Sequence, residues 1–166
     1  TVALTLSDGF CVDRHRDAFL DMVEHHVDLL FANEAEILSL YQTDSFDEAA
    51  ERVRHHGAVA ALTRSEHGSV IVTEDDTITV PAHPIDELVD TTGAGDLYAA
   101  GFLFGYSRGV DLATCGALGS LAAAEVNSSE PTKNTTPSAT GPTSWRNPGK
   151  GATRKQADPA ANSTAI

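Results

Sequence analysis

The sequence predicts an α/β fold, a mostly parallel sheet flanked by helices, followed by a disordered C-terminal tail. Residues 1–126 alternate short apolar runs with segments whose apolar residues recur at helical spacing, and this alternation is typical of parallel strands with helices on both faces. Residues 127–166 contain no Leu, Val or Phe, and 24 of these 40 residues are Ser, Thr, Asn, Pro or Gly. Such a composition buries too little apolar surface to offset chain entropy. We therefore predict a folded part, 1–126, and a low-complexity tail, 127–166.

Two strand–helix units are expected at the start of the folded part. The apolar run 2–6 predicts a strand, and the segment 13–26 carries apolar residues at helical spacing. The run D-L-L-F-A at 28–32 predicts a second, buried strand, and 33–41 predicts the helix that follows it. Short strands joined by single helices favour parallel pairing of neighbours.

The next segments predict one more helix and three strands. The sequence S-F-D-E at the start of 45–56 is typical of a capping box that opens a helix. The run 58–63 predicts a third strand, and the runs 69–73 and 77–81 around an acidic turn predict a β-hairpin. Asp111 can cap a last helix that extends to about residue 126.

The most informative run is D-T-T-G-A-G-D at 90–96, which predicts a tight turn that opens a helix reaching about residue 107. Consecutive backbone N–H groups in such a turn, with the positive end of the helix dipole, can bind one anion. A carboxylate in the first helical turn could then take a proton from an attacking hydroxyl, as phosphoryl transfer requires. Taken alone, the same run fits equally well a glycine-rich turn with an acid that merely favours the helix start. The residues concerned are Gly93, Ala94 and Gly95 for the anion and Asp96 for the proton.

Charge and cysteine content narrow the choice of partners. The formal net charge of −13 argues against general nucleic-acid binding, which needs a basic surface. Cys11 and Cys115 have no metal-ligand spacing, so we expect free thiols in a reducing compartment. No apolar run approaches membrane-spanning length and no signal peptide is visible. We predict a cytoplasmic protein without nucleic-acid or membrane partners.

The run D-T-T-G-A-G-D-x-x-x-A-G-F from Asp90 to Phe102 resembles the second signature of the PfkB (ribokinase-like) family of carbohydrate and nucleoside kinases. The resemblance implies a ribokinase-like fold and ATP as phosphoryl donor. It implies that Asp96 is the catalytic base and that Gly93, Ala94 and Gly95 form the anion hole. It covers residues 1–126 and corresponds to the C-terminal half of family members. We therefore expect a fragment that lacks the N-terminal half, which holds the acceptor.

The segment N-E-A-E at 33–36 resembles the family's N-x-x-E motif. This resemblance implies that Asn33 lies near the nucleotide and that Glu36 helps to organise Mg²⁺, usually through water. Magnesium retains several waters and needs few protein ligands, so a single outer carboxylate is chemically sensible. The alternative is purely local, because Asn33 is a good helix cap and Glu36 then falls in the first helical turn.

The segment T-R-S-E-H-G at 63–68 resembles the family's T-x-G-x-x-G segment, which implies contacts with the nucleotide phosphates. Thr63, Ser65 and Gly68 take the motif positions, and Ser65 replaces the first glycine. Arg64 could pair with phosphate, although an arginine beyond a strand end is often simply solvated. Gly68 can also be required by the turn alone.

Together these features predict an ATP- and Mg²⁺-dependent phosphotransferase whose acceptor is a hydroxyl of a sugar or nucleoside. The segments S-D-G-F-C-V-D-R at 7–14 and L-F-A-N-E at 30–34 look closest to bacterial adenosine-kinase-like members, which makes adenosine a candidate acceptor. An inactive or nucleotide-binding-only remnant is the first alternative. A Rossmann-type dinucleotide enzyme is the second, and the lack of G-x-G-x-x-G after the first strand argues against it.

Overall fold

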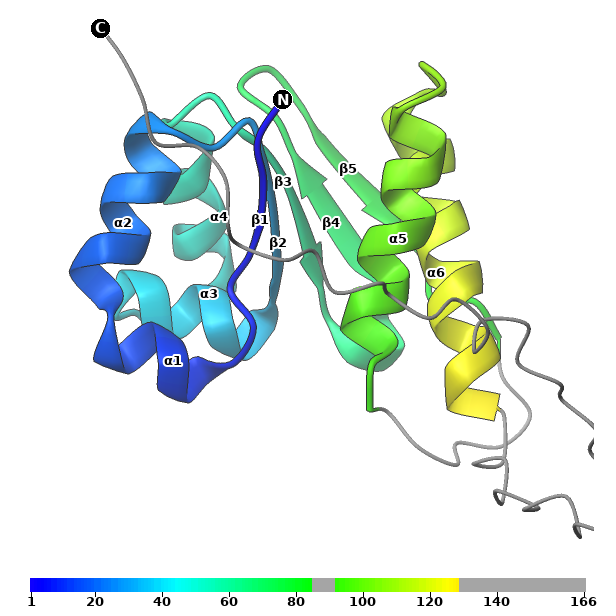
Figure 1. The fold of residues 1–166 in the computed structure, drawn as a ribbon, viewed down its shortest axis with the longest axis horizontal. Helices are drawn as coiled ribbons and strands as arrows, with labels where there is room; N and C mark the ends of the chain where they lie inside the picture. Colours follow the sequence, from blue (N-terminus) through cyan, green and yellow to red (C-terminus); the bar gives the residue numbers. More distant parts are fainter. Residues whose placement is uncertain (85–91, 129–166) are drawn as a thin grey trace, which may run out of the picture. The chain divides into compact units, whose positions relative to one another are not determined.

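The computed structural model describes residues 1–84 and 92–128, which form a five-stranded sheet with helices on both faces (Figure 1). Its strand order is β1-β2-β3-β4-β5; β1, β2 and β3 are parallel, and β4 and β5 continue the sheet antiparallel. The α/β class is confirmed, with a mixed sheet because the predicted hairpin joins the same sheet as its outer two strands. The strands are Ala3–Thr5, Leu29–Asn33, Val59–Thr63, Ser69–Val72 and Thr77–Val80.

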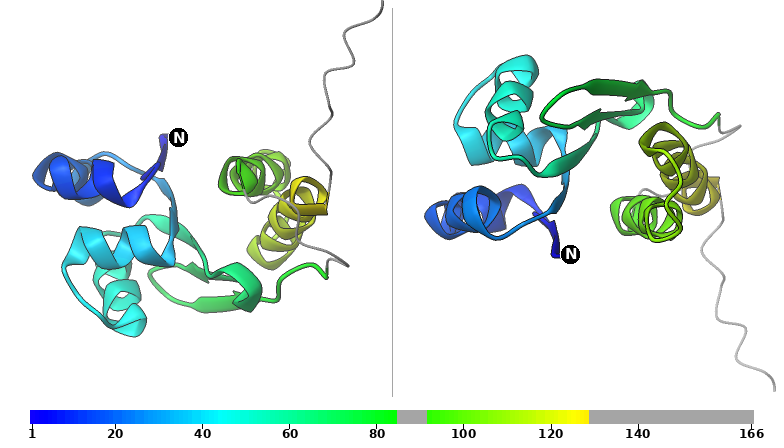
Figure 2. Two further views of the ribbon diagram at one scale, coloured as in Figure 1. Left: turned by 90° about the horizontal axis from the view of Figure 1, so that it is seen from below. Right: turned by 90° about the horizontal axis from the view of Figure 1, so that it is seen from above.

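Helices α1 to α4 cover one face of the sheet, and α5 and α6 cover the other (Figure 2). The first group fills the connections between the parallel strands, and the second follows the hairpin in the chain. The helices are α1 Gly9–Arg14, α2 Arg16–His25, α3 Glu34–Tyr41, α4 Phe46–Arg54, α5 Ala94–Tyr106 and α6 Leu112–Ser128, with a short 3₁₀ turn, η1, at Ser65–His67.

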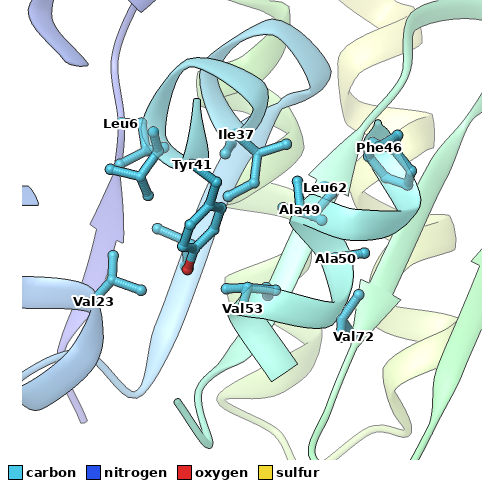
Figure 3. Packing of buried hydrophobic residues seen from close by; sticks show 14 of the residues in the cluster. Leu6, Val23, Ile37, Tyr41, Phe46, Ala49, Ala50, Val53, Leu62 and Val72 are labelled. Carbon is cyan, nitrogen blue, oxygen red and sulfur yellow. The ribbon is translucent and has the colours of Figure 1, made fainter. Parts of the chain in front are cut away.

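Alternating side chains of the strands build one core on each face, as the period of two requires. Leu30 in β2 and Leu62 in β3 are fully buried in the core beneath α1 to α4. Figure 3 shows part of this core, with Tyr41 of α3 beside side chains from the neighbouring helices. Phe31 points to the other face, where its ring meets Phe102 of α5 edge to face, with 5.4 Å between the ring centroids.

Helix α1 was not predicted, and its presence changes the start of the chain. Asp8 caps it, accepting a hydrogen bond from the Cys11 N–H at 2.8 Å. The predicted helix over 13–26 is wrong in its first part, because the chain breaks at His15 and starts again as α2. Val12 is the one buried residue of α1, so six residues with a single core contact leave too weak a periodic pattern to recognise.

The capping box predicted at the start of α4 is only half formed. The Ser45 hydroxyl accepts a hydrogen bond from the Glu48 N–H at 3.3 Å, as predicted. The return bond is missing, because the Glu48 carboxylate binds Thr43 Oγ1 and Arg52, and the Ser45 N–H donates to Thr43 Oγ1. Thr43 and Arg52 thus hold the Glu48 carboxylate in place of the Ser45 N–H, and the capping box stays incomplete.

Arginines supply donors to backbone carbonyls at two exposed ends of the structure. Arg16 and Arg52 donate to the carbonyls of Leu40 and Tyr41 at the C-terminus of α3, at 2.7 and 2.8 Å. Carbonyls of a last helical turn have no partner within the helix, so these bonds stabilise its end. Arg54 donates to the Thr73 carbonyl just after the end of β4 and to the Thr77 hydroxyl at the start of β5.

Helix α6 extends to Ser128, two residues beyond its predicted end. The prediction of a disordered tail falls on the rest of the chain, 129–166, and lies outside the described residues. Within residues 1–84 and 92–128, none of the helices has both the length and the apolar character needed to cross a membrane.

Candidate functional site

The candidate site starts at the carboxyl ends of β2 and β3, where Asn33 and Thr63 are paired in the parallel ladder. Carboxyl ends of parallel strands are the usual ligand-binding edge of such sheets. Asn33 ends β2 and caps α3, its side-chain oxygen accepting the Glu36 N–H at 2.9 Å. The two strands therefore deliver both predicted residues, Asn33 and Thr63, to one edge.

Glu36 closes a complete capping box with Asn33. Its two carboxylate oxygens accept the Asn33 backbone N–H at 2.9 Å and the Asn33 side-chain amide at 2.8 Å. The residue is 6% exposed, and burial raises the pKa of this carboxyl above its usual value, with the charge of Asp8 adding to the increase. These contacts are those of the local alternative, in which Asn33 caps the helix and Glu36 lies in its first turn. A role of Glu36 in organising Mg²⁺ stays a prediction.

Residues 63–68 form a tight turn around η1. The Arg64 N–H donates to the Gly68 carbonyl at 2.7 Å, and the Gly68 N–H donates to the Ser65 carbonyl at 3.1 Å. Ser65 has φ of 50° and Gly68 has φ of 85°, both in the left-handed region that favours glycine. Ser65 thus has a left-handed conformation at the position where the family's motif has its first glycine.

Arg64 leaves this turn on the side of α3 and α4. Its Nη2 donates to Glu34 Oε1 at 2.9 Å, and its guanidinium carbon lies 4.1 Å from the centroid of the Phe46 ring. Its Nε is buried without a hydrogen-bond partner among the described residues. The guanidinium is therefore held by an ion pair and an aromatic face, and phosphate binding by Arg64 stays a prediction.

The start of α5 supplies a second set of donors. Gly93 is the cap residue with φ of 82°, a left-handed conformation that suits glycine, and its carbonyl accepts the Leu97 N–H at 3.0 Å. The helix consequently gives the N–H groups of Ala94, Gly95 and Asp96 no intrahelical partner. Asp96 is exposed in the first turn of α5, as predicted. The first two residues of the signature, at 90 and 91, lie outside the described residues.

A cavity of about 1060 Å³ joins the strand ends to the start of α5. Tyr98 lines this cavity, and its hydroxyl donates to the oxygen of the buried Ser69 at 2.7 Å. Burial raises the pKa of the Tyr98 hydroxyl, so it remains a neutral donor. The lining residues are Asn33, Glu34, Ala35, Leu38, Thr63, Ser65, Glu66, Gly68, Ala82, His83, Pro84, Ala94, Gly95, Tyr98, Ser120, Ala123 and Ala124.

The structure brings most of the predicted site residues to this cavity. Asn33, Thr63, Ser65, Gly68, Ala94 and Gly95 line it. Gly93, Asp96, Arg64 and Glu36 adjoin these residues in the chain but do not line it.

Glu34 and Tyr98 also line the cavity and were not predicted from the sequence. Glu34 directly follows the strand end, so the position of Asn33 could have indicated it. Tyr98 is two residues beyond the predicted base, and only its packing against β4 reveals its place.

The donor set of the cavity fits an anion. Unpaired first-turn N–H groups beside the hydroxyls of Thr63 and Ser65 are suited to phosphate oxygens. For Mg²⁺, the described residues bring no three His, Cys, Asp or Glu side chains together. An ion held chiefly by phosphates and water needs no such cluster, and Glu36 could assist it only indirectly, because it does not line the cavity.

A three-layer α/β fold with a helix start and strand ends around one cavity is common among enzymes that bind phosphate groups. Residues 4–139 match the pfkB family of carbohydrate kinases. A nucleoside kinase from Methanocaldococcus jannaschii is 36% identical over 113 residues, which are 67% of this chain and 36% of that protein. The chain belongs to the pfkB carbohydrate kinase family.

Solved structures agree with this assignment. A probable sugar kinase from Rhizobium etli is 53% identical with a TM-score of 0.74, over 75% of this chain and 38% of that one. Adenosine kinase from Sinorhizobium meliloti is 51% identical with the same TM-score and the same coverage. The ribokinase-like fold is therefore confirmed. The chain spans less than two fifths of the length of these relatives.

Proposed function

We propose that this chain is the nucleotide-binding part of a cytoplasmic ATP-dependent kinase that phosphorylates a hydroxyl of a nucleoside or sugar. The observation that carries the proposal is the cavity that joins the start of α5 to the ends of β2 and β3. Three separate chain segments converge there, and two of them, the turn at 63–68 and the start of α5, bring hydroxyl or N–H groups that suit phosphate. The family membership and the nucleoside and adenosine kinases among the relatives support the same reaction class.

In this proposal the turn at 93–95 binds the transferring phosphoryl group. Its N–H groups and the helix dipole would stabilise the negative charge that spreads over the phosphoryl oxygens in the transition state. Thr63, Ser65 and Gly68 would flank the rest of the nucleotide chain, with Asn33 at the neighbouring strand end. Bound Mg²⁺ would neutralise phosphate charge.

Asp96 would take the proton of the acceptor hydroxyl. Its place in the first turn of α5 sets the carboxylate next to the anion-binding N–H groups, and its exposure leaves it free to meet an acceptor. In this proposal the acceptor itself would be held largely by an N-terminal half of the kinase, as the family resemblance implies. Adenosine is the first acceptor to test, because an adenosine kinase is among the relatives at about 50% identity.

The test compares Asp96→Asn with Asp47→Asn, another exposed aspartate in the first turn of a helix, on the opposite face of the sheet. For both variants we measure the rate of phosphoryl transfer from ATP to adenosine, cytidine and ribose. The protein used is the one encoded by the whole open reading frame that contains this chain. Loss of a general base typically lowers the rate by about 10²–10⁴. We expect that loss for Asp96→Asn with ATP affinity preserved, and near-normal rates for Asp47→Asn.

Near-normal turnover of Asp96→Asn would refute the role of Asp96 as base. The same test covers the alternative of an inactive, nucleotide-binding remnant of such a kinase. That alternative predicts ATP binding by the wild type without transfer to any acceptor.

A further inference from the structure

Two acidic side chains line a cavity for which we propose an anionic ligand, and only one of them has a firmly held cation. Glu66 is 80% exposed, and its partner is His67 at 3.7 Å, itself 68% exposed. Glu34 is 36% exposed and is paired with Arg64 at 2.9 Å. The charge of Glu66 is screened by water, whereas that of Glu34 is compensated by a fixed guanidinium.

The fold itself builds the pair. Asn33 and Thr63 are register partners in the parallel β2–β3 ladder, so the residues that follow them, Glu34 and Arg64, leave the sheet side by side. The Phe46 ring supports the flat face of the guanidinium, which fixes its orientation in the manner of a cation–π contact. Glu34 faces the cavity, while Arg64 lies behind it and does not line it.

We infer that Arg64 is a positioning residue for nucleotide binding, which acts by holding and neutralising the Glu34 carboxylate rather than by binding phosphate. The inference rests on the proposed nucleotide site and assigns this ion pair a role in it. Without Arg64 the cavity wall carries an uncompensated negative charge that repels the phosphates. Because Coulomb energy is proportional to charge, the loss must increase from adenosine through AMP and ADP to ATP.

The experiment measures binding of these four ligands to the 166-residue chain by titration calorimetry at low and high salt. The series is compared without Mg²⁺, so that the negative charge of the ligand rises from adenosine to ATP, and ATP is also titrated with Mg²⁺. The variants are Arg64→Met, Glu34→Gln and their double mutant. Arg108→Met is the matched control, because Arg108 also stacks on a phenylalanine, at 3.6 Å from the Phe104 centroid, but lies beyond the end of α5 and outside the cavity lining. Arg64→Lys retains the charge, and helix content by circular dichroism shows that each variant is folded.

We expect Arg64→Met to weaken ATP binding about three- to tenfold and adenosine binding hardly at all, with a smaller effect at high salt. The double mutant should bind ATP within about twofold of the wild type, because the neutral glutamine that replaces Glu34 needs no cation. Arg64→Lys should restore part of the affinity, and Arg108→Met should bind like the wild type.

Equal losses for all four ligands would show a purely structural role and overturn the inference. A double mutant as weak as Arg64→Met would show that Arg64 binds phosphate directly, and would also overturn it. A wild type that binds none of the phosphorylated ligands would refute the proposed function, and the inference with it. ATP binding that is unchanged by Arg64→Met would refute the inference alone.

Discussion

Gly68 offers a test of whether a predicted site residue is needed by the fold as well as by the nucleotide. A Cβ atom at this position would lie 2.1 Å from the Val80 carbonyl oxygen and 2.6 Å from the Ala82 nitrogen. Both are backbone atoms, so neither can rotate away as a side chain would. Gly57 is the matched control, since its φ of 73° is close to the 85° of Gly68, but nothing lies within 4 Å of its added Cβ.

The two alanine variants therefore separate backbone strain from steric conflict. A left-handed alanine costs about 1 kcal/mol relative to glycine, and the backbone strain is at least as large at Gly68, where φ is 85° and ψ is −133°. Gly68→Ala must also displace the end of β5, and forced overpacking adds about 1–3 kcal/mol. We expect the free energy of unfolding to fall by about 1 kcal/mol for Gly57→Ala and by about 2–4 kcal/mol for Gly68→Ala.

Urea unfolding of the two variants and the wild type, followed by circular dichroism, measures the difference. Linear extrapolation gives the free energies if the three slopes agree. Losses of stability that agree within about 0.5 kcal/mol would refute the close approach of Val80 and Ala82 to the turn. A loss of ATP binding by Gly68→Ala without that extra destabilisation would then assign Gly68 to the ligand alone.

Three further changes test the contacts around the site and the core. Glu36→Gln should preserve α3, because glutamine also serves in a capping box, and should remove one pH dependence. Because the pKa of Glu36 is raised in the folded state, the free energy of unfolding of the wild type should fall as pH rises from about 4.5 through that pKa. Urea unfolding at several pH values measures this fall, and an equal fall in Glu36→Gln would contradict the prediction. Arg54→Met should lower the free energy of unfolding, measured in urea, by about 2 kcal/mol, because Nη1 and Nη2 donate to Thr73 and Thr77 at 2.9 and 2.5 Å. A change below about 0.5 kcal/mol would show that water replaces these bonds. Tyr41→Phe should leave stability unchanged or raise it by up to about 1 kcal/mol, because the buried Tyr41 hydroxyl (Figure 3) has no hydrogen-bond partner among the described residues; a clear loss in the same assay would reveal a partner, such as a buried water.

Elements with a strong local signal could be predicted from the sequence. The strand 28–32 was recognised from a continuous apolar run, and it is β2, buried on both faces. The helix start in the run 90–96 was recognised from its tight turn of small residues, and Gly93 caps the helix in a left-handed conformation. Helix α1 was missed because its signal is a single cap, Asp8, and a single buried residue, Val12.

The candidate site shows where such local signals end. In N-E-A-E, the third residue after the cap is Glu36, and helix geometry alone turns it back onto Asn33. The first residue after the cap is Glu34, and nothing local decides its partner. That partner follows from the register of β2 with β3, which places Arg64 beside it across 30 residues of sequence.

Glu36 and Glu34, the two glutamates of this short motif, therefore have different partners: those of Glu36 are set by the helix start, and that of Glu34 is set by strand register. Glu36 is hydrogen-bonded within a capping box, a local motif of helix starts, so its contacts need no ligand. Glu34 is placed on the cavity wall, beside a cation held on an aromatic ring, by the pairing of two strands. The part of the site that is particular to this chain lies in contacts set by strand register, and these are the contacts that the Arg64 and Glu34 variants probe.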